Sequence, residues 1–376
     1  MAEPLKNLFN PGVILEMSAQ LARIPGFDTA GFETAALNGL ESLEMMQRSA
    51  QIAAALRTSL PQAPFSQTLA ALSGILHPET EAELDSLPLD GRGLRGWALV
   101  PVGTLVAEDG LGHPQESLRF LREMTMRFSA EFAVRPFFRD HTALTLAHAQ
   151  AWARDANFHV RRLASEGSRP RLPWGLRLAA FVETPAPLIP ILTALRDDPA
   201  EYVRRSVANS LNDIAKDHPD LVARLAADWL QGAPPPRRKL VKHALRSLIK
   251  AGHPGALAAL GYRPPDGVTA ALGVAPDTIR LGDSVTLSLS LQSPSSLPVL
   301  IDYAVFFRKA DGRLSPKVFK WTETRLDPNV PLTLSKRVPL RDVTTRRHYP
   351  GEQAVAVQVN GVTLAKAGFN LELAAG

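Results

Sequence analysis

The 376-residue sequence has no cysteine, and this absence excludes several kinds of chemistry. No disulfide, thiolate metal site or cysteine nucleophile is available, which fits a reducing compartment. Residues 1–10 lack the basic charge and the long apolar run of a signal peptide. No window reaches about 18 consecutive apolar residues either, so the sequence predicts no membrane span.

Familiar catalytic and cofactor motifs are also missing. There is no Gly-x-x-x-x-Gly-Lys phosphate loop, no His-Glu-x-x-His metal helix, no Gly-x-Ser-x-Gly turn and no Rossmann glycine fingerprint. The nine histidines are scattered, and His113, His218 and His253 each precede a proline, as is typical of helix boundaries. We therefore expect neither a metal nor an organic cofactor.

The residues that are present predict two or more folded domains and an uneven distribution of charge. The 45% hydrophobic and 21% charged residues are typical of a globular protein. Residues 1–110 carry 6 Lys and Arg against 13 Asp and Glu, whereas residues 111–265 carry 23 against 14. Such a basic segment indicates a polyanionic partner such as nucleic acid, although a solvated surface without a partner would give the same count.

Helical periodicity dominates from about residue 11 to residue 260, where apolar residues recur at spacings of three and four. The clearest helices are expected over residues 40–60, 114–128, 141–156, 199–216 and 237–251. Weak repeats, such as Val-Arg-Arg at 160–162 and 203–205, indicate stacked helix pairs of the HEAT type. We predict a mainly α-helical repeat solenoid with a concave groove over residues 1–262.

The pattern changes at the Pro- and Gly-rich segment 261–267, after which apolar residues alternate with a period of two. Val285, Leu287, Leu289 and Leu291 alternate in this way, and Asp311-Gly312 and Asn360-Gly361 are typical hairpin turns. We predict an all-β immunoglobulin-like sandwich over residues 268–376. Candidate core residues of this sandwich are Phe306, Trp321 and Phe369.

Three segments of the basic region combine carboxylates with arginines at helical spacing. Glu131 and Arg135 are four residues apart, Arg162 and Glu166 are four apart, and Arg205 is two turns before Asp213. Taken singly, each is an ordinary surface ion pair contributing about 0 to 1 kcal/mol. Together, carboxylates within a phosphate-binding groove would repel the ligand unless they have a function. Pro136 is expected to end or kink the helix that contains Arg135.

The segment 167–175 is rich in proline and glycine and is expected to form an irregular loop. It joins Arg169 and Arg171 to Trp174, eight residues after Glu166. The indole could be a buried anchor or an exposed stacking surface. An indole face beside carboxylates is a suitable receptor for a flat cation.

Residues 129–137, 159–174 and 202–214 resemble the AlkC family of bacterial DNA glycosylases, which belongs with AlkD among the HEAT-like alkylation-repair proteins. The resemblance covers the helical body, and some family members have an immunoglobulin-like C-terminal domain. It implies excision of 3-methyladenine and 3-methylcytosine from duplex DNA in base excision repair, without a metal and without full base flipping. It also implies a cytoplasmic protein. We expect a monomer with no obligate protein partner.

Carried over by motif, the resemblance implies an active-site set of Glu131, Glu166, Trp174 and Asp213. A base methylated at N3 is already cationic and leaves without protonation, so the task is electrostatic. Fixed carboxylates can stabilise the oxocarbenium-like transition state and direct a water. We expect phosphates to be bound by Arg135, Arg161, Arg162, Arg169, Arg171, Arg204, Arg205, Lys239, Lys242, Arg346 and Arg347.

Two other functions remain open at this stage. A non-catalytic helical-repeat scaffold would bind a protein through its groove and would show no salt-sensitive affinity for DNA. An architectural DNA-binding protein would bind DNA without releasing a base. Release of bases from methylated DNA distinguishes both from a glycosylase.

Overall fold

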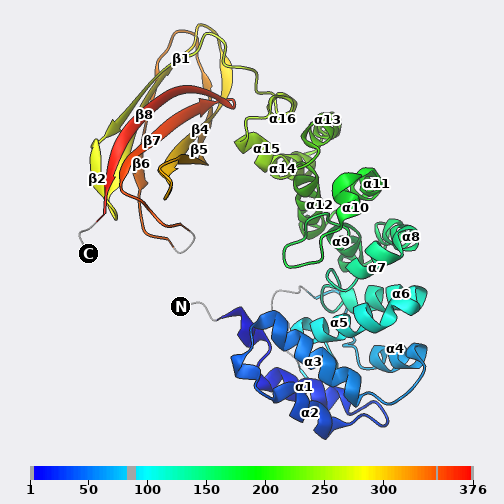
Figure 1. Ribbon diagram of the computed structural model, residues 1–376. Helices are drawn as coiled ribbons and strands as arrows, with labels where there is room; N and C mark the ends of the chain where they lie inside the picture. Colours follow the sequence, from blue (N-terminus) through cyan, green and yellow to red (C-terminus); the bar gives the residue numbers. More distant parts are fainter. Residues whose placement is uncertain (1–3, 83–89, 344–345, 374–376) are drawn as a thin grey trace. The chain divides into compact units, whose positions relative to one another are not determined.

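The computed structural model describes residues 4–82, 90–343 and 346–373 (Figure 1). The chain forms two compact units. The first comprises the chain up to Asp217 together with Pro234–Ala244, and the second comprises His218–Ala233 and the chain from Leu245 onward. Over the described residues, none of the helices has the length and apolar character needed to cross a membrane.

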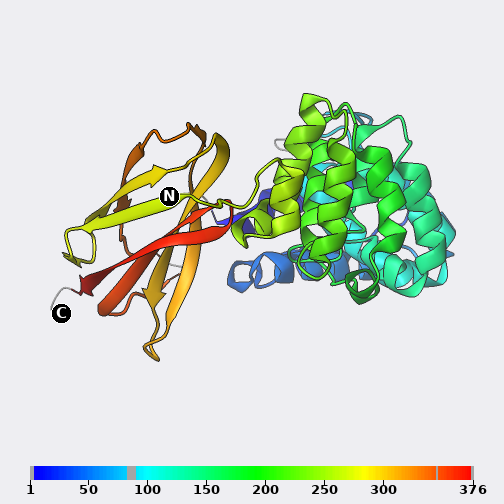
Figure 2. The same cartoon turned by 90° about the horizontal axis from the view of Figure 1, so that it is seen from above.

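The first unit is helical. Its helices are α1 Pro11–Leu21, α2 Thr29–Leu37, α3 Met45–Ser59, α4 Phe65–Ser73, α5 Leu99–Asp109, α6 Pro114–Thr125, α7 Arg135–Asp140, α8 Thr142–Trp152, α9 Phe158–Glu166, α10 Ala179–Glu183, α11 Ile189–Leu195, α12 Glu201–Ile214 and α14 Pro235–Ala244. Each packs mainly on helices close to it in the chain, such as α8 on α9, α9 on α12 and α12 on α14. Figure 2 shows successive helices lying side by side, as expected for a repeat fold.

Helix α12 shows how the sequence specifies this packing. Val203, Val207, Leu211 and Ile214 are all buried, which confirms the apolar stripe of its sequence. Asp213 is buried as well, with 3% of the residue exposed, because α12 is covered on more than one side by its neighbours.

The prediction that Pro136 ends or kinks a helix is wrong, because Pro136 stands at the beginning of one. Pro136 lies in the first turn of α7, where the absent N–H would have no partner in any case. Residues 131–134 before it form a turn. Glu131 and Arg135 are therefore not on one helix and do not form the predicted pair four residues apart.

The second unit contains helices and two β-sheets. The helices are α13 Pro219–Leu230, α15 Arg246–Lys250 and α16 Pro254–Ala259, and the strands are β1 Thr269–Ala275, β2 Thr278–Arg280, β3 Ser284–Gln292, β4 Leu297–Arg308, β5 Leu314–Leu326, β6 Leu332–Pro339, β7 Gly351–Val359 and β8 Val362–Glu372. One sheet has the order β1-β3-β6 and the other β2-β8-β7-β4-β5, with antiparallel neighbours except for the parallel pair β2 and β8. That residues 1–262 and 268–376 form two separate domains stays a prediction.

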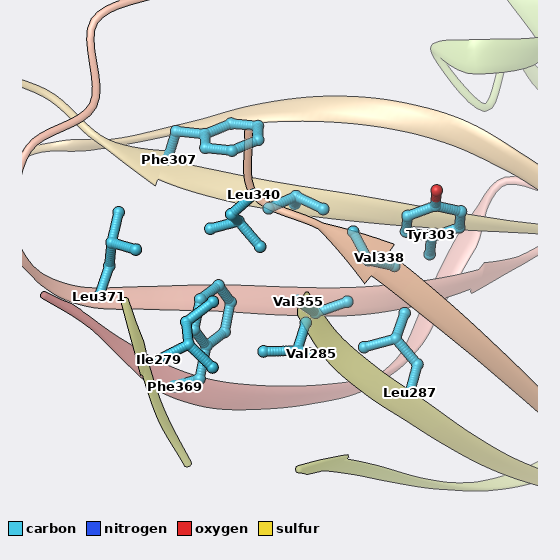
Figure 3. Packing of buried hydrophobic residues seen from close by; sticks show 11 residues of the cluster. Ile279, Val285, Leu287, Tyr303, Phe307, Val338, Leu340, Val355, Phe369 and Leu371 are labelled. Atoms are coloured by element: carbon cyan, nitrogen blue, oxygen red, sulfur yellow. The ribbon is translucent and has the colours of Figure 1, made fainter. Parts of the chain in front are cut away.

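The two sheets enclose an apolar core (Figure 3). Val285 and Leu287 of β3 point into it, together with Phe307 of β4 and Phe369 of β8. The alternation in β3 and the burial of Phe369 confirm the sequence pattern. Trp321 packs against the core from a half-buried position.

Phe306 was a candidate for the same core, and this expectation is wrong by one residue. Phe307 is buried, whereas Phe306 is half-buried and lies beneath the ammonium group of Lys366, 5.0 Å from the ring centre. Two consecutive residues of a strand point to opposite faces, so a run of apolar residues does not reveal which one is internal.

Both predicted hairpins are present, β4–β5 and β7–β8. Asn360 and Gly361 in the second have φ values of 48° and 81°, as their turn type requires. The turn also touches the segment between α15 and α16, because a Cβ added to Gly361 would lie 2.6 Å from the Cα of Gly252. Only glycines permit this approach of two backbones.

Candidate active site

Carboxylates and arginines alternate across the interior of the first unit. Arg162 of α9 donates from Nη1 to Oε2 of Glu131 at 2.6 Å, and its Nη2 lies 3.8 Å from Glu166. Arg169 donates from Nη1 to Oε1 of Glu166 at 2.7 Å and from Nε to Oδ2 of Asp213 at 2.9 Å. We call Glu131, Glu166 and Asp213 the carboxylate row. Three segments distant in sequence therefore bring the predicted carboxylates together.

Two arginines hold Glu166, the middle carboxylate of the row, in its charged form. Burial alone would raise the pKa of Glu166, but the charges of Arg162 and Arg169 outweigh it and hold that pKa below its ordinary value. Burial opposes the charge of Arg162 in turn, yet Glu131 and Glu166 raise its pKa further. Such mutually supported charges keep their positions when the surroundings change, which suits electrostatic catalysis.

Glu131 is the most exposed of the three carboxylates, and the hydrogen bonds to its carboxylate all go to one oxygen. Its Oε2 accepts from Arg162 and from the hydroxyl of Ser129, the latter at 2.5 Å. Among the described residues, no hydrogen bond to its Oε1 is found. The Glu131 side chain is 14% exposed, compared with 7% for Glu166 and 4% for Asp213. Glu131 therefore has both an unused oxygen and some access to solvent.

Both oxygens of Asp213 are in use. Oδ2 accepts from Arg169, and Oδ1 accepts from the ammonium group of Lys216 at 3.2 Å. The sequence pattern suggested Arg205 as a companion of Asp213, but Arg205 lies 3.8 Å from Glu201 instead.

Trp174 lies on the loop 167–176, which we call the indole loop. The irregular structure expected there is confirmed, since residues 167–178, which join α9 to α10, contain neither helix nor strand. The indole is 66% exposed, so the structure favours the exposed surface over the buried anchor. Its φ of 61° places a bulky residue in the left-handed region, which is rare outside glycine.

Several arginines expected to bind phosphate have internal partners. Arg161 donates to Asp198 and to the carbonyls of Asp155 and Ala156. Arg204 donates from Nη1 to the carbonyls of Asp198 and Pro199. Both guanidinium groups are bound to the protein's own backbone and are poorly placed to bind a phosphate.

Arg162 and Arg169, which bridge the carboxylate row, are also poorly placed to bind a phosphate, and so is Arg135, which is fully buried. Burial, together with the nearby charge of Arg169, lowers the pKa of Arg135 to about 10. Arg171 is partly exposed and pairs with Asp217 at 2.7 Å.

Exposed basic side chains gather on α12 and α14. Arg205 and Lys239 are largely exposed, and both flank Glu201, with the Lys239 ammonium 2.8 Å from its carboxylate. These three residues, together with His243, line a surface pocket of about 110 Å³. Lys242 is exposed on the same helix as Lys239. Within the first unit, this basic patch is the most exposed part of the set predicted to bind phosphate.

Arg346 and Arg347, the basic pair of the second unit, have different surroundings. The Arg346 guanidinium lies 3.7 Å from the ring centre of Phe307, and burial lowers its pKa. Arg347 is exposed and lies 5.6 Å from the ring of Tyr349. Arg347 is therefore the better placed of the two to meet a phosphate.

Sequence reasoning missed three polar or aromatic supports of the row. The Ser129 hydroxyl contacts Glu131, the Ser206 hydroxyl helps to lower the pKa of Glu166, and the Tyr202 ring lies 4.7 Å from the Arg162 guanidinium carbon. Of these three, only Ser129 could have been found from the sequence, because it stands two residues before Glu131. Among the described residues, no cluster of three or more His, Asp or Glu side chains is arranged to hold a metal ion.

Known proteins resemble this chain along almost its whole length. A family model described as the C-terminal Ig-like domain of the uncharacterised protein YhaZ matches residues 268–373. The protein YhaZ of Bacillus subtilis (strain 168) is 38% identical over 360 residues, covering 95% of this chain and 96% of that protein. The solved structure of the Pseudomonas fluorescens alkylpurine DNA glycosylase AlkC, bound to DNA containing an abasic site analog, is 38% identical with a TM-score of 0.88.

That structure covers 98% of this chain, and this chain covers all of it. The agreement extends over the helices that carry the carboxylate row and over the β-sandwich. It confirms the resemblance predicted from three short motifs. This chain belongs to the AlkC family, with the C-terminal Ig-like domain that YhaZ also has.

Proposed function

We propose that this protein is a DNA glycosylase that excises bases alkylated at N3, 3-methyladenine and 3-methylcytosine, from duplex DNA in base excision repair. The observation that carries the proposal is the carboxylate row, whose three carboxylates are bridged by Arg162 and Arg169, in a member of the AlkC family. A related alkylpurine DNA glycosylase shares its fold and 38% of its residues.

The chemistry requires a stabilised cation and a directed water. A base methylated at N3 carries positive charge and departs without a general acid. As the glycosidic bond lengthens, positive charge moves to the sugar, where fixed carboxylates lower the barrier. The arginine partners of the row neutralise part of its charge, so the effective negative site is the oxygen that they leave unbonded.

Glu131 is the carboxylate best suited to orient the attacking water. Its Oε1 has no hydrogen bond among the described residues, whereas Oε2 is fixed by Arg162 and Ser129. A carboxylate held on one oxygen and open on the other can accept a proton from water at a defined position. Glu166 and Asp213 would then act mainly through their charge.

Trp174 is suited to contact the lesion nucleotide from outside. Its exposed indole offers an electron-rich face to a cationic base and an apolar face to the sugar. A ring at the surface can reach a nucleotide that remains within the duplex, which supports attack without full base flipping.

Phosphates would be bound by the exposed basic groups. We assign this role to Arg171, Arg205, Lys239, Lys242 and Arg347. Arg171, Arg205 and Lys239 pair with carboxylates of the protein, so a phosphate would replace these partners on binding.

The decisive test is release of bases from methylated genomic DNA, with the products identified by chromatography. We expect 3-methyladenine and 3-methylcytosine, and no release of unmodified bases. Binding to DNA without release would instead support an architectural protein. Absence of both release and salt-sensitive DNA binding would support a protein-binding scaffold.

A further inference from the structure

Arg135 is a charged residue of the site for which the proposed chemistry has no use. It begins α7, and its side chain is among the largest that are completely buried in the described part of the chain. A residue that binds phosphate would need its guanidinium group at the surface. Its role must be sought in what it contacts inside the protein.

The Arg135 guanidinium joins the two ends of the indole loop. Nη1 donates to the carbonyl oxygen of Gly167 at 2.9 Å, where the loop leaves α9. Nε donates to the carbonyl oxygen of Leu176, two residues after the indole. Donation from a charged group makes these bonds stronger than ordinary backbone hydrogen bonds.

The backbone hydrogen bonds that close the second half of the loop are weaker restraints. Gly175 N–H donates to the carbonyl of Leu172 at 3.2 Å, and Leu178 N–H donates to that of Pro170 at 3.2 Å. Both distances are at the long end of the usual range for N–H donors. The Arg135 guanidinium is therefore the charged link between the two ends of the loop, whose middle is held by Arg169 on Asp213 and by Arg171 on Asp217.

Arg135 also passes directly beneath the residue next to the indole. A Cβ added to Gly175 would lie 3.2 Å from both Cδ and Nε of Arg135. Trp174 itself has a φ of 61° and a largely exposed ring, so side-chain packing does little to fix it. A bulky residue keeps such a conformation only when its surroundings impose it.

The remaining donor of Arg135 indicates that this arrangement is not optimised for stability. Its Nη2 is buried and has no hydrogen-bond partner among the described residues. A buried donor without a partner is destabilising. Its retention favours a functional reason for an arginine here, since a lysine could not span both carbonyls.

We propose that Arg135 is a positioning residue, which fixes the indole loop and thereby sets where Trp174 stands relative to the carboxylate row. It touches neither substrate nor reacting atoms. This inference rests on the proposed glycosylase function for its effect on rate, but its effect on the loop can be measured without any activity.

The test compares Arg135→Met and Arg135→Lys with the wild type in two measurements. The first is trypsin cleavage after Arg171 and Arg177, which lie in and beside the loop and are present in every variant. The second is the separation of kcat from KM for base release. Arg48→Met is the matched control. Arg48 is also buried and donates to backbone carbonyls, those of Leu43, Lys6 and Phe9, but it lies far from the indole loop in the sequence.

For Arg135→Met we expect kcat to fall about 10- to 100-fold with little change in KM, since small misplacements of positioned groups have effects of this size. Cleavage after Arg171 and Arg177 should accelerate by about fivefold or more, because the loop opens locally. For Arg135→Lys, kcat and the rate of loop cleavage should lie between those of the wild type and those of Arg135→Met. Arg48→Met should lower the melting temperature without changing kcat or cleavage in the loop.

Two results would overturn the proposal. One is unchanged loop cleavage in a folded Arg135→Met protein. The other is a raised KM and a weaker salt dependence at unchanged kcat, which would make Arg135 a phosphate ligand. If Arg135→Met does not fold, Gly175→Ala displaces the loop while retaining Arg135 and should show the same two changes. If the wild type releases no base, the glycosylase proposal fails, and loop cleavage alone decides the role of Arg135.

Discussion

Among the three carboxylates, Glu131 is the most exposed, and its Oε1 has no hydrogen bond within the part of the chain that the structure describes. Replacing Glu131 by Gln preserves its shape but removes the charge. We expect kcat for release of 3-methyladenine to fall about 10²- to 10³-fold, as for other lost electrostatic contacts to a transition state. Single-turnover assays at saturating protein would measure this.

Glu123→Gln is the matched control for that measurement. Glu123 also pairs with arginines, Arg122 and Arg127, but outside the carboxylate row. Its loss should leave the rate within about twofold, as for other exposed ion pairs. Equal rates for wild type and Glu131→Gln would remove Glu131 from the catalytic set.

At this scale the sequence grouped the three carboxylates, whose roles stay a prediction, but it did not reveal their partners. Glu131, Glu166 and Asp213 were identified, yet Glu131 pairs with Arg162 rather than Arg135, and Asp213 is internal. Spacing along one helix cannot reveal pairs formed between helices. The burial of Arg135 was equally hidden, because it depends on the path of the indole loop.

Two hairpins of the sandwich have the same turn glycine but different surroundings. Gly312 has a φ of 82°, and a Cβ there would meet only Arg308 Nη2 at 3.7 Å. At Gly361 a Cβ would also lie 2.6 Å from the Cα of Gly252. Gly312→Ala should therefore cost about 1 to 2 kcal/mol of unfolding free energy from its backbone conformation alone.

We expect Gly361→Ala to cost about 1 to 3 kcal/mol more than Gly312→Ala, because it also overpacks the contact with Gly252. Urea denaturation of the two variants measures the difference. Equal losses would mean that the contact between the hairpin and the α15–α16 turn yields without strain.

A buried carboxylate in β4 makes the second unit sensitive to pH. Burial raises the pKa of Asp302 to about 6, against the opposing charges of Lys320 and Lys250 and with the support of Glu323. Because the folded pKa lies above the unfolded one, the folded state binds the proton more tightly. The stability that Asp302 gains from this tighter proton binding is fully present below about pH 4 and is lost as pH rises through about 6.

Asp302→Asn should therefore stabilise the protein at about pH 8, by about 2 to 3 kcal/mol if the whole shift of the pKa is recovered. The gain should nearly disappear at about pH 4, where Asp302 is protonated in both states. Thermal melts across this range test the prediction. Asp311→Asn on the exposed β4–β5 turn is the control, and a similar gain there would contradict the role of burial.

The elements themselves were largely predictable. Period-two alternation and the Asp-Gly and Asn-Gly turns indicated the hairpins, because these signals are local. Pro136 was misplaced because proline both ends and begins helices, and only its neighbours decide between them. Phe306 and Phe307 were exchanged because a continuous apolar run fixes no register.

For the whole molecule, affinity for DNA should depend on the exposed basic groups rather than on all the arginines of the basic region. Lys239 is largely exposed and pairs with Glu201. Lys239→Gln should weaken binding to all sequences alike and reduce the slope of log affinity against log salt by about one. Fluorescence anisotropy with labelled duplexes measures this slope.

Lys6→Gln is the comparison, since Lys6 also pairs with a glutamate, Glu44, in the acidic N-terminal third. Its slope should equal that of the wild type. A loss of slope in both variants would mean that general charge, rather than the basic patch on α12 and α14, determines the affinity.

The chain passes between the two compact units more than once, since α14 belongs to the first unit while α13 before it and α15 after it belong to the second. No single position in the sequence separates the units. A crossover that exchanged the sandwich between two relatives at residue 268 would leave Gly252, before α16, and Leu257 of α16 against a foreign hairpin at Gly361. Helix α16 and the sandwich should therefore be inherited together, and hybrid proteins should tolerate the exchange only when both come from one parent.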